Sequence, residues 1–212
     1  MKKSAIIVAG GTGTRMKSDV PKQFLLIDEV PILVHTIRKF LTYDGEIQLV
    51  VVLPESHLQQ WQFVKSQYFP DVEIIATNGG ETRSASVLSG LLFVKEGLVA
   101  VHDAVRPFVS VDTIAKSFES AEEKGSGVAA VQLKDSIREL ANESSIARDR
   151  ANYVLVQTPQ TFDSAKLQEA YRIAGVGSFT DDASVYEAAG NKVHLIYGTY
   201  ENIKITTPED LR

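Results

Sequence analysis

Short apolar runs alternate with amphipathic segments along this chain, and no other feature constrains the fold as strongly. Five runs are almost continuously apolar, as in strands that are covered on both faces: Ile6–Ala9, Leu49–Leu53, Val72–Ile75, Leu98–Val101 and Val128–Val131. Helical spacing of apolar residues between them predicts helices over 33–41 and 111–121 and after Ser164, with Ser110 as an N-cap and Gly175 just past a helix end. This order predicts right-handed βαβ units, a mostly parallel sheet and ligand-binding loops at the carboxyl ends of the strands.

Bulk composition narrows the class of protein. The chain has 212 residues, 44% hydrophobic and 23% charged, which indicates one folded domain over 1–212. A net charge of −5 argues against a general nucleic-acid binder, and the absence of cysteine excludes disulfides and thiolate chemistry. The first apolar run is too short for a signal sequence, and no run approaches the ~20 residues of a membrane span. We therefore expect a cytoplasmic protein with no membrane partner.

The stretch 134–159 breaks the alternation. It contains no convincing helix and no buried strand, but "KDSIREL" and "NYVLVQTPQ" alternate loosely on either side of the polar "ANESSIARDR". Two alternating runs around a polar tip predict a projecting β-hairpin arm. Because an isolated hairpin is marginal in water, we expect it to pair with the same arm of a second copy in a homodimer.

A glycine-rich loop follows the first strand and resembles neither common phosphate-binding motif. A P-loop would need glycine where Arg15 stands, and a dinucleotide fingerprint would need a third glycine where Met16 stands. Backbone amides of such a loop can still surround an anion, and Arg15 and Lys22 carry charges suited to phosphate. The alternative is a tight turn with solvated basic residues.

Two further loops follow predicted strands. In "VHDAVRPFV", Asp103 is placed to hold Mg²⁺ with phosphate oxygens or to cap a turn, Arg106 could pair with it, and His102 is more typical of a packed histidine. In "NGGETRSASV", Gly79 and Gly80 could let the backbone approach a flat base. The alternative is an ordinary loop followed by a helix cap, which would have the same sequence pattern.

Two polar stretches near the C-terminus complete the candidate sites. The stretch "TDDAS" reads as a helix N-cap. Lys204 interrupts the alternation of Ile203 and Ile205, and it could be solvated or could point into the site.

Seven motifs occur in one order along nearly the whole chain. They are A-x-G-x-G-x-R-M with P-K-Q-F, G-G-x-x-R-x-x-S-V, H-D-x-x-R-P, K-D-[ST]-I, T-P-Q, T-D-[DE]-A-S and N-I-K-[IV]-T-x-P-[ED]-D-L. In this combination the chain resembles the 2-C-methyl-D-erythritol 4-phosphate cytidylyltransferase family. The resemblance implies a Rossmann-like α/β fold of nucleotidyltransferase type. It also implies transfer of CMP from CTP to the phosphate of 2-C-methyl-D-erythritol 4-phosphate, with release of pyrophosphate, in isoprenoid biosynthesis.

The same resemblance assigns roles to individual residues. It implies that Arg15 and Lys22 stabilise charge on the reacting phosphates, that Asp103 holds Mg²⁺, and that Lys204 steers the acceptor phosphate. Nucleotide-binding positions would be Ala9, Gly10, Gly11, Thr12, Gly13, Gly79, Gly80, Glu81, Ser86, Ala104 and Arg106. On the arm, over 134–159, Ser136, Arg150 and Thr158 would serve the acceptor, with the arm reaching the partner subunit's site.

Three alternatives stay open at this point. Ribitol-5-phosphate cytidylyltransferase shares most of these motifs, whereas "KDSI" and "TDDAS" are more typical of the isoprenoid enzyme. A non-catalytic nucleotide-binding protein could use the same fold, although four charges at Arg15, Lys22, Asp103 and Lys204 exceed what binding needs. A sugar nucleotidylyltransferase with another base would prefer UTP or GTP over CTP.

Overall fold

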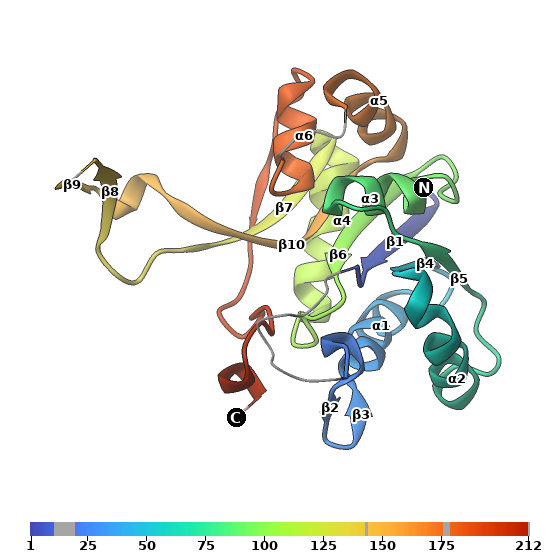
Figure 1. Ribbon diagram of the computed structural model, residues 1–212. Coiled ribbons are helices and arrows are strands. Elements are labelled where there is room, and N and C mark those ends of the chain that lie inside the picture. Colours follow the sequence, from blue (N-terminus) through green and yellow to red (C-terminus); the bar gives the residue numbers. More distant parts are fainter. Residues whose placement is uncertain (11–19, 143, 176–178, 212) are drawn as a thin grey trace.

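A computed structural model describes residues 1–10, 20–142, 144–175 and 179–211. Its centre is a seven-stranded sheet in the order β11-β7-β10-β6-β1-β4-β5 (Figure 1). The strands are β1 (Lys3–Val8), β4 (Gln48–Leu53), β5 (Ile74–Asn78), β6 (Leu98–Asp103), β7 (Ser126–Gln132), β10 (Val154–Asp163) and β11 (Leu195–Tyr197). Only β10 runs antiparallel to its neighbours, so the α/β class with a mostly parallel sheet is confirmed.

The predicted apolar runs form five of the seven strands of the sheet, with β5 at one edge. Each of the five runs overlaps a strand, and the run Val72–Ile75 begins two residues before β5 does. The strand β6 continues past its apolar run through His102 to Asp103, which places that carboxylate at the carboxyl end of the sheet. Loops that follow β1, β5 and β6 therefore meet at one edge.

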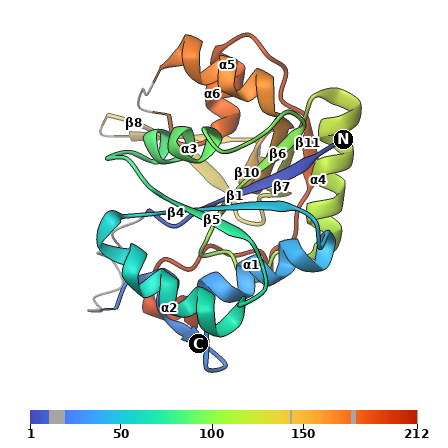
Figure 2. The same ribbon diagram turned by 90° about the vertical axis from the view of Figure 1, so that its right-hand side faces the viewer.

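Two layers of helices cover the faces of the sheet, as Figure 2 shows. Strand residues alternate between the layers: Ile7 packs with one hydrophobic cluster and Ile6 with the other. One layer holds α1 (Ile32–Tyr43), α2 (Leu58–Tyr68) and α4 (Val111–Lys124), and the other holds α3 (Arg83–Leu91), α5 (Ser164–Ala174) and α6 (Asp182–Ala188). None of the helices in the described ranges is long and apolar enough to cross a membrane.

Helix ends follow the predicted capping residues. Ser110 accepts a hydrogen bond from the Thr113 amide at the start of α4, and Gly175 with φ 70° ends α5. Within "TDDAS", Asp181 caps α6 through the Ser184 amide. These N-caps are confirmed. Shorter elements are the strands β2 (Leu26–Ile27) and β3 (Val30–Pro31) and the 3-10 helices η2 (Lys22–Phe24), η3 (Glu55–His57) and η5 (Pro208–Leu211).

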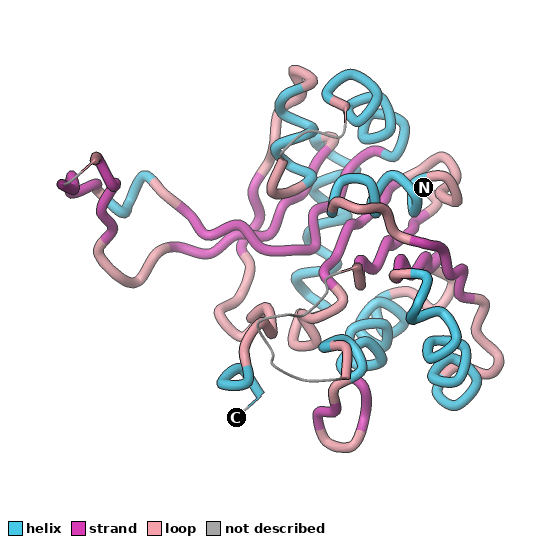
Figure 3. The backbone as a smooth tube through the Cα atoms, viewed as in Figure 1, coloured by secondary structure: helices cyan, strands magenta, loops and turns pink. Residues whose placement is uncertain are grey.

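An arm projects from the body of the molecule, as predicted, but its pairing differs from the expectation (Figure 3). The strand β8 (Ile137–Ala141) pairs with β9 (Ser144–Arg148), which lies in the polar stretch that was expected to be the tip. The 3-10 helix η4 (Arg150–Asn152) then leads into β10. The expected pairing of "KDSIREL" with "NYVLVQTPQ" is therefore wrong, because the chain turns back earlier, at Asn142 with φ 48°.

The expectation that 134–159 holds no buried strand is wrong only at its last three residues, 157–159, where the stretch enters the buried part of β10. Gln157–Phe162 is buried within β10 between β6 and β7. The polar side chains there are satisfied by distant partners: Gln160 bonds Asp181, and the Thr161 hydroxyl bonds that of Ser117. Buried polar groups need such partners, and these lie too far along the chain for a local pattern to reveal them.

Candidate active site at the carboxyl edge of the sheet

A cavity of about 260 Å³ opens where the loops after β1, β5 and β6 converge. The segment after β11 closes it through Lys204, and η2 contributes Lys22. The described lining residues are Val8, Ala9, Gly10, Lys22, Gln23, Gly80, Glu81, Thr82, Arg83, Ser86, Asp103, Val105 and Lys204. The structure thus brings together most of the predicted site residues of the body.

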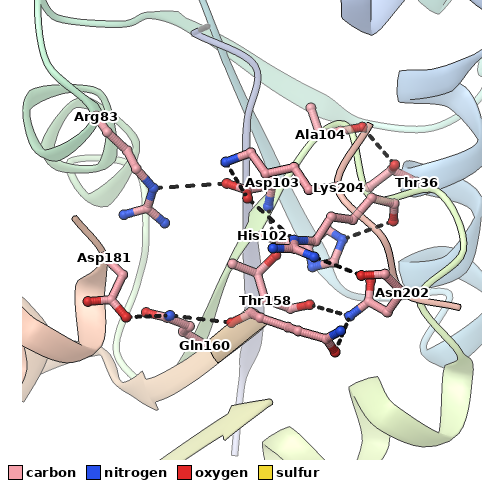
Figure 4. A network of polar contacts seen from close by, with 12 residues as sticks. Thr36, Arg83, His102, Asp103, Ala104, Thr158, Gln160, Asp181, Asn202 and Lys204 are labelled. Carbon is pink, nitrogen blue, oxygen red and sulfur yellow. Dashed lines mark hydrogen bonds and ion pairs between the residues drawn. The ribbon is translucent and has the colours of Figure 1, made fainter. Parts of the chain in front are cut away.

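Asp103 is the centre of charge in this cavity (Figure 4). Its Oδ2 lies 2.9 Å from Lys204 Nζ and 3.4 Å from Arg106 Nε, and its Oδ1 lies 3.9 Å from Arg83 Nε. Burial alone would raise the pKa of Asp103, but the charges of Lys204, Arg83 and Arg106 outweigh it and hold the pKa far below its usual range. The carboxylate is therefore ionised under all physiological conditions.

Lys204 points into the site, which decides between the two alternatives left open by the sequence. Its side chain is partly exposed, and its ammonium group forms the 2.9 Å ion pair with Asp103. The next residue, Ile205, is fully buried and donates its amide to the Val105 carbonyl at 2.9 Å. Lys204 therefore leaves a fixed backbone and presents its charge to the cavity.

Arg83 is a site residue for which the sequence alone predicts no role. It stands at the start of α3 and donates from Nη2 to Asp182 Oδ2 at 2.6 Å, while its Nε faces Asp103. Burial alone would lower the pKa of Arg83, but the Asp182 carboxylate, helped by Asp103, raises it further above its usual value. Its place as the R of G-G-x-x-R was the available signal, but its partner Asp182 lies 99 residues away.

The loop after β5 is closely packed around Ser86. The Ser86 hydroxyl donates to the Thr82 carbonyl at 3.0 Å and accepts from the Gly80 amide at 3.2 Å. A β-carbon on Gly79 would lie 2.8 Å from Ser86 Oγ, and one on Gly80 would collide with Ala85. Space for a side chain is therefore absent at Gly80, and at Gly79 one would displace the Ser86 hydroxyl, so glycine at both positions lets this loop lie close against α3. Glu81 follows on the cavity wall.

Three predicted residues lie behind the cavity wall. The Ala104 amide donates to the Val8 carbonyl, and its own carbonyl accepts from the Thr36 hydroxyl at 2.8 Å. Arg106 donates from Nη1 to the Asn202 carbonyl at 2.7 Å, and Thr158 Oγ1 accepts from the Asp103 amide at 3.1 Å. In this chain these groups brace Asp103.

His102 is a packed residue, as expected. It is fully buried, its Nε2 lies 3.3 Å from the Arg106 carbonyl, and its ring meets Phe40 edge-on at 5.1 Å. Burial lowers the pKa of His102 to about 4, so the ring is neutral near pH 7. Among the described residues no three His, Cys, Asp or Glu side chains cluster as a metal site, so a cation here would rely on Asp103 and on ligand oxygens.

The remaining predicted residues divide into two groups. Gly11, Thr12, Gly13 and Arg15 lie outside the described residues. Ser136 and Arg150 lie on the arm, and Arg150 Nη1 donates to the Lys134 carbonyl there. Because the arm projects away from the body, the structure does not bring these two residues to the cavity of their own chain (Figure 1).

A mostly parallel sheet with a cavity at its carboxyl edge, lined by Lys22, Arg83 and Lys204, defines an α/β protein with its ligand site in the position usual for this class. The family model described as "IspD: 2-C-methyl-D-erythritol 4-phosphate cytidylyltransferase" matches residues 4–212. The chain belongs to this family of cytidylyltransferases, and the resemblance noted in the sequence is confirmed.

Relatives of the chain carry the same description over nearly their whole length. It is 46% identical to the 2-C-methyl-D-erythritol 4-phosphate cytidylyltransferase of Bacteroides thetaiotaomicron, over 100% of this chain and 97% of the relative. This chain is 49% identical to the 2-C-methyl-D-erythritol 4-phosphate cytidylyltransferase of Porphyromonas gingivalis, over 99% of this chain and 95% of the relative. The crystal structure of 4-diphosphocytidyl-2C-methyl-D-erythritol synthase from Anaerococcus prevotii matches with a TM-score of 0.86 at 27% identity, over 99% of this chain and 92% of that one.

Proposed function

We propose that this chain transfers CMP from CTP to the phosphate of 2-C-methyl-D-erythritol 4-phosphate, giving 4-diphosphocytidyl-2-C-methyl-D-erythritol and pyrophosphate in the non-mevalonate route to isoprenoids. The observation that carries the proposal is the cluster of Lys204, Arg83 and Asp103 on the wall of a cavity that the loops after β1, β5 and β6 form. Such a cluster suits a reaction between two phosphates, since each of them is anionic.

In this reaction an oxygen of the acceptor phosphate attacks the α-phosphorus of CTP. The new oxygen–phosphorus bond forms as the bond to the bridging oxygen breaks, and pyrophosphate leaves with that electron pair. The acceptor phosphate is already an anion at neutral pH, so no general base is needed, and positioning and charge neutralisation carry the catalysis. Lys204 steers the acceptor phosphate, and Lys22 together with Arg15 stabilises charge on the α-phosphate and the leaving group.

The two glycine-containing loops bind the nucleotide. The flat loop at Gly79 and Gly80 receives the base, with Glu81 and Ser86 beside it, and Gly10 begins the loop that surrounds the triphosphate. Ala104 and Arg106 act from behind by holding Asp103 in place.

Mg²⁺ is the divalent cation that this site would use. The residues present fit it: Asp103 is an ionised carboxylate on the cavity wall, and Mg²⁺ in nucleotide sites is held by one or two carboxylates together with phosphate oxygens. When bound, it would neutralise charge on the phosphates and orient them for displacement.

A homodimer formed through the arm would complete the acceptor site. Ser136 and Arg150 are exposed on an arm that projects away from its own body, so they would act in the partner's site. Thr158, in contrast, is buried at the base of the arm and supports Asp103 in its own chain.

Pyrophosphate release tests the proposal. The protein is mixed with CTP, Mg²⁺ and either 2-C-methyl-D-erythritol 4-phosphate or ribitol 5-phosphate, and the Lys204→Ala variant provides the background. Release with the first acceptor alone is expected, and replacing CTP with UTP or GTP should abolish it. Release with ribitol 5-phosphate alone would overturn the acceptor, and CTP binding without release from either would favour a non-catalytic protein.

A further inference from the structure

Asn202 is a fully buried residue outside the cavity that joins three separate parts of the chain. Its Nδ2 donates to the Thr158 carbonyl at 2.8 Å and to Gln157 Oε1 at 3.2 Å, both of which belong to β10. Its own carbonyl accepts from Arg106 Nη1 at 2.7 Å. Figure 4 shows Asn202 beside Thr158, and below Asp103 and Lys204 in that view.

An irregularity in β10 makes these contacts available. The register with β7 shifts between Val156 and Gln160, so the residues between them leave the regular ladder. The backbone carbonyl of Thr158, which is outside the ladder, accepts from Asn202, and the side-chain hydroxyl of Thr158 accepts from the Asp103 amide at 3.1 Å. One bulge therefore holds both the residue that carries the carboxylate and the segment that carries the lysine.

The segment around Lys204 has an anchor on each side. On the C-terminal side, Ile205 is buried and bonds the Val105 carbonyl at 2.9 Å. On the N-terminal side, Asn202 is anchored by its side chain to β10 and by its backbone carbonyl to Arg106, and substitution by alanine removes only the first of these anchors. A lysine has four rotatable side-chain bonds, so the ion pair with Asp103 alone does not fix where its backbone lies.

We propose that Asn202 is a positioning residue for Lys204: its carboxamide ties the lysine-bearing segment to the bulge at the base of the arm and thereby sets Lys204 Nζ against Asp103. The inference rests on the proposed function only for its kinetic consequence, since the placement of Lys204 is a structural statement. The same bulge continues outward into Val154–Val156 at the base of the arm, so arm and lysine share one support.

Acylation of lysines tests the placement without any turnover. The full-length protein and Asn202→Ala are treated briefly with acetic anhydride, and acetylation of each lysine is quantified by mass spectrometry. Acylation requires an amine that has left its carboxylate partner. Lys204 should therefore react several-fold faster in Asn202→Ala, while Lys116 on the outer face of α4 should react at an unchanged rate. An unchanged rate at Lys204 in a folded Asn202→Ala protein would overturn the inference, whatever the substrate of the enzyme.

A double-mutant cycle then tests the kinetic consequence. Asn202→Ala should lower kcat/KM for the acceptor phosphate by about 10-fold or more, with the Kd for CTP changed less than about twofold. In a Lys204→Ala background the same substitution should have less than about a twofold effect, because a residue that acts only through Lys204 has nothing left to position. Full additivity of the two losses would contradict the proposal.

Two further variants guard this test. Asn191→Ala is the matched control, because Asn191 Nδ2 also donates to a backbone carbonyl, that of Tyr186 at 3.2 Å, but outside the cavity lining. It should leave the acylation of Lys204 and kcat/KM unchanged. If Asn202→Ala does not fold, Gln157→Leu removes one of the two acceptors of Asn202 and should give the same pattern with a smaller amplitude; no change at Lys204 in that variant would overturn the inference.

Discussion

The cavity wall and the arm are built in opposite ways. At the cavity, Asp103 is buried and receives partners from α3, from the loop after β6 and from the segment after β11. On the arm, β8 and β9 pair only with each other, contain no buried residue, and leave Leu140 86% exposed. The body thus holds its polar site with its own core, whereas the arm is a two-stranded sheet that would be marginal in isolation.

The strand β10 passes from one kind of structure to the other. Its first part, Val154–Val156, is largely exposed, and its second part, Gln157–Phe162, is buried in the sheet. Side chains in the second part should therefore affect the stability of the body and the placement of its site residues. Side chains in the first part should affect the association of two chains. Substitutions that separate these two consequences test the comparison.

The largest effect is expected at the buried end of the comparison, for Asp103→Asn. This isosteric change removes the charge that Lys204, Arg83 and Arg106 surround, and with it the proposed Mg²⁺ ligand. We expect kcat for pyrophosphate release to fall about 100- to 1,000-fold, as for loss of a preorganised electrostatic group.

The matched control for this change is Asp112→Asn. Asp112 forms an exposed pair with Lys116 on α4, which should contribute almost nothing to catalysis. A kcat within twofold of wild type for Asp103→Asn, in a protein that still binds CTP, would remove Asp103 from the reaction.

The next effect is expected for Tyr171→Phe, which tests how strongly the buried polar contacts of the body hold α5 against α6. Tyr171 donates to Asp182 Oδ1 at 2.6 Å, and burial together with the Asp182 carboxylate raises the pKa of Tyr171, so the phenol keeps its proton. Loss of this donor should lower the free energy of unfolding by about 1–3 kcal/mol, measured in urea. Tyr197→Phe, at a tyrosine that is 85% exposed, should change nothing; equal losses would mean that burial does not set the cost.

Support of buried polar side chains by distant partners is also what the sequence could not reveal. Apolar runs located five of the seven strands, because strands covered on both faces are apolar along most of their length. The buried half of β10 escaped because it is polar, and its Gln160 is satisfied by Asp181 and by the amides of Asp182 and Ala183, more than twenty residues away. A polar strand looks like a loop until its partners are known.

The candidate site shows the same limit. Loops after strands were the right place to search, since the carboxyl ends of parallel strands meet at one edge, and Asp103 and Lys204 do meet there. Arg83 and Asn202 escaped notice because their roles depend on Asp182 and on Thr158, which folding alone brings near. Local motifs locate charges; they do not say which charges share a partner.

A smaller effect is expected for Leu155→Ser, at the exposed end of the comparison. Leu155 is 54% exposed at the base of the arm, and an arm-mediated dimer would cover it. Full burial of a leucine side chain contributes about 1.5–3 kcal/mol, and only the exposed half of Leu155 is left for a dimer to cover. Its loss should therefore cost about 1 kcal/mol and raise the Kd for self-association about fivefold, measured by sedimentation. Leu92→Ser, at an exposed leucine on the body, should leave association unchanged. Identical association for both variants would place the dimer interface away from the arm.

The smallest effect is expected for Arg148→Ala, which removes a pair that lies wholly on the arm. Arg148 Nε donates to Glu139 Oε2 at 2.6 Å between two exposed side chains, so its loss should lower the free energy of unfolding by less than about 1 kcal/mol. Arg172→Ala removes a comparable exposed pair with Glu169 on α5 and is the matched control on the body. Urea unfolding of both variants is compared at protein concentrations above and below the Kd for self-association. A loss of unfolding free energy for Arg148→Ala at the high concentration alone would show that the dimer covers this pair. It would also sharpen the contrast between a body that is stable by itself and an arm that needs a partner. A large loss at the low concentration would instead show that the arm is stabilised within its own chain.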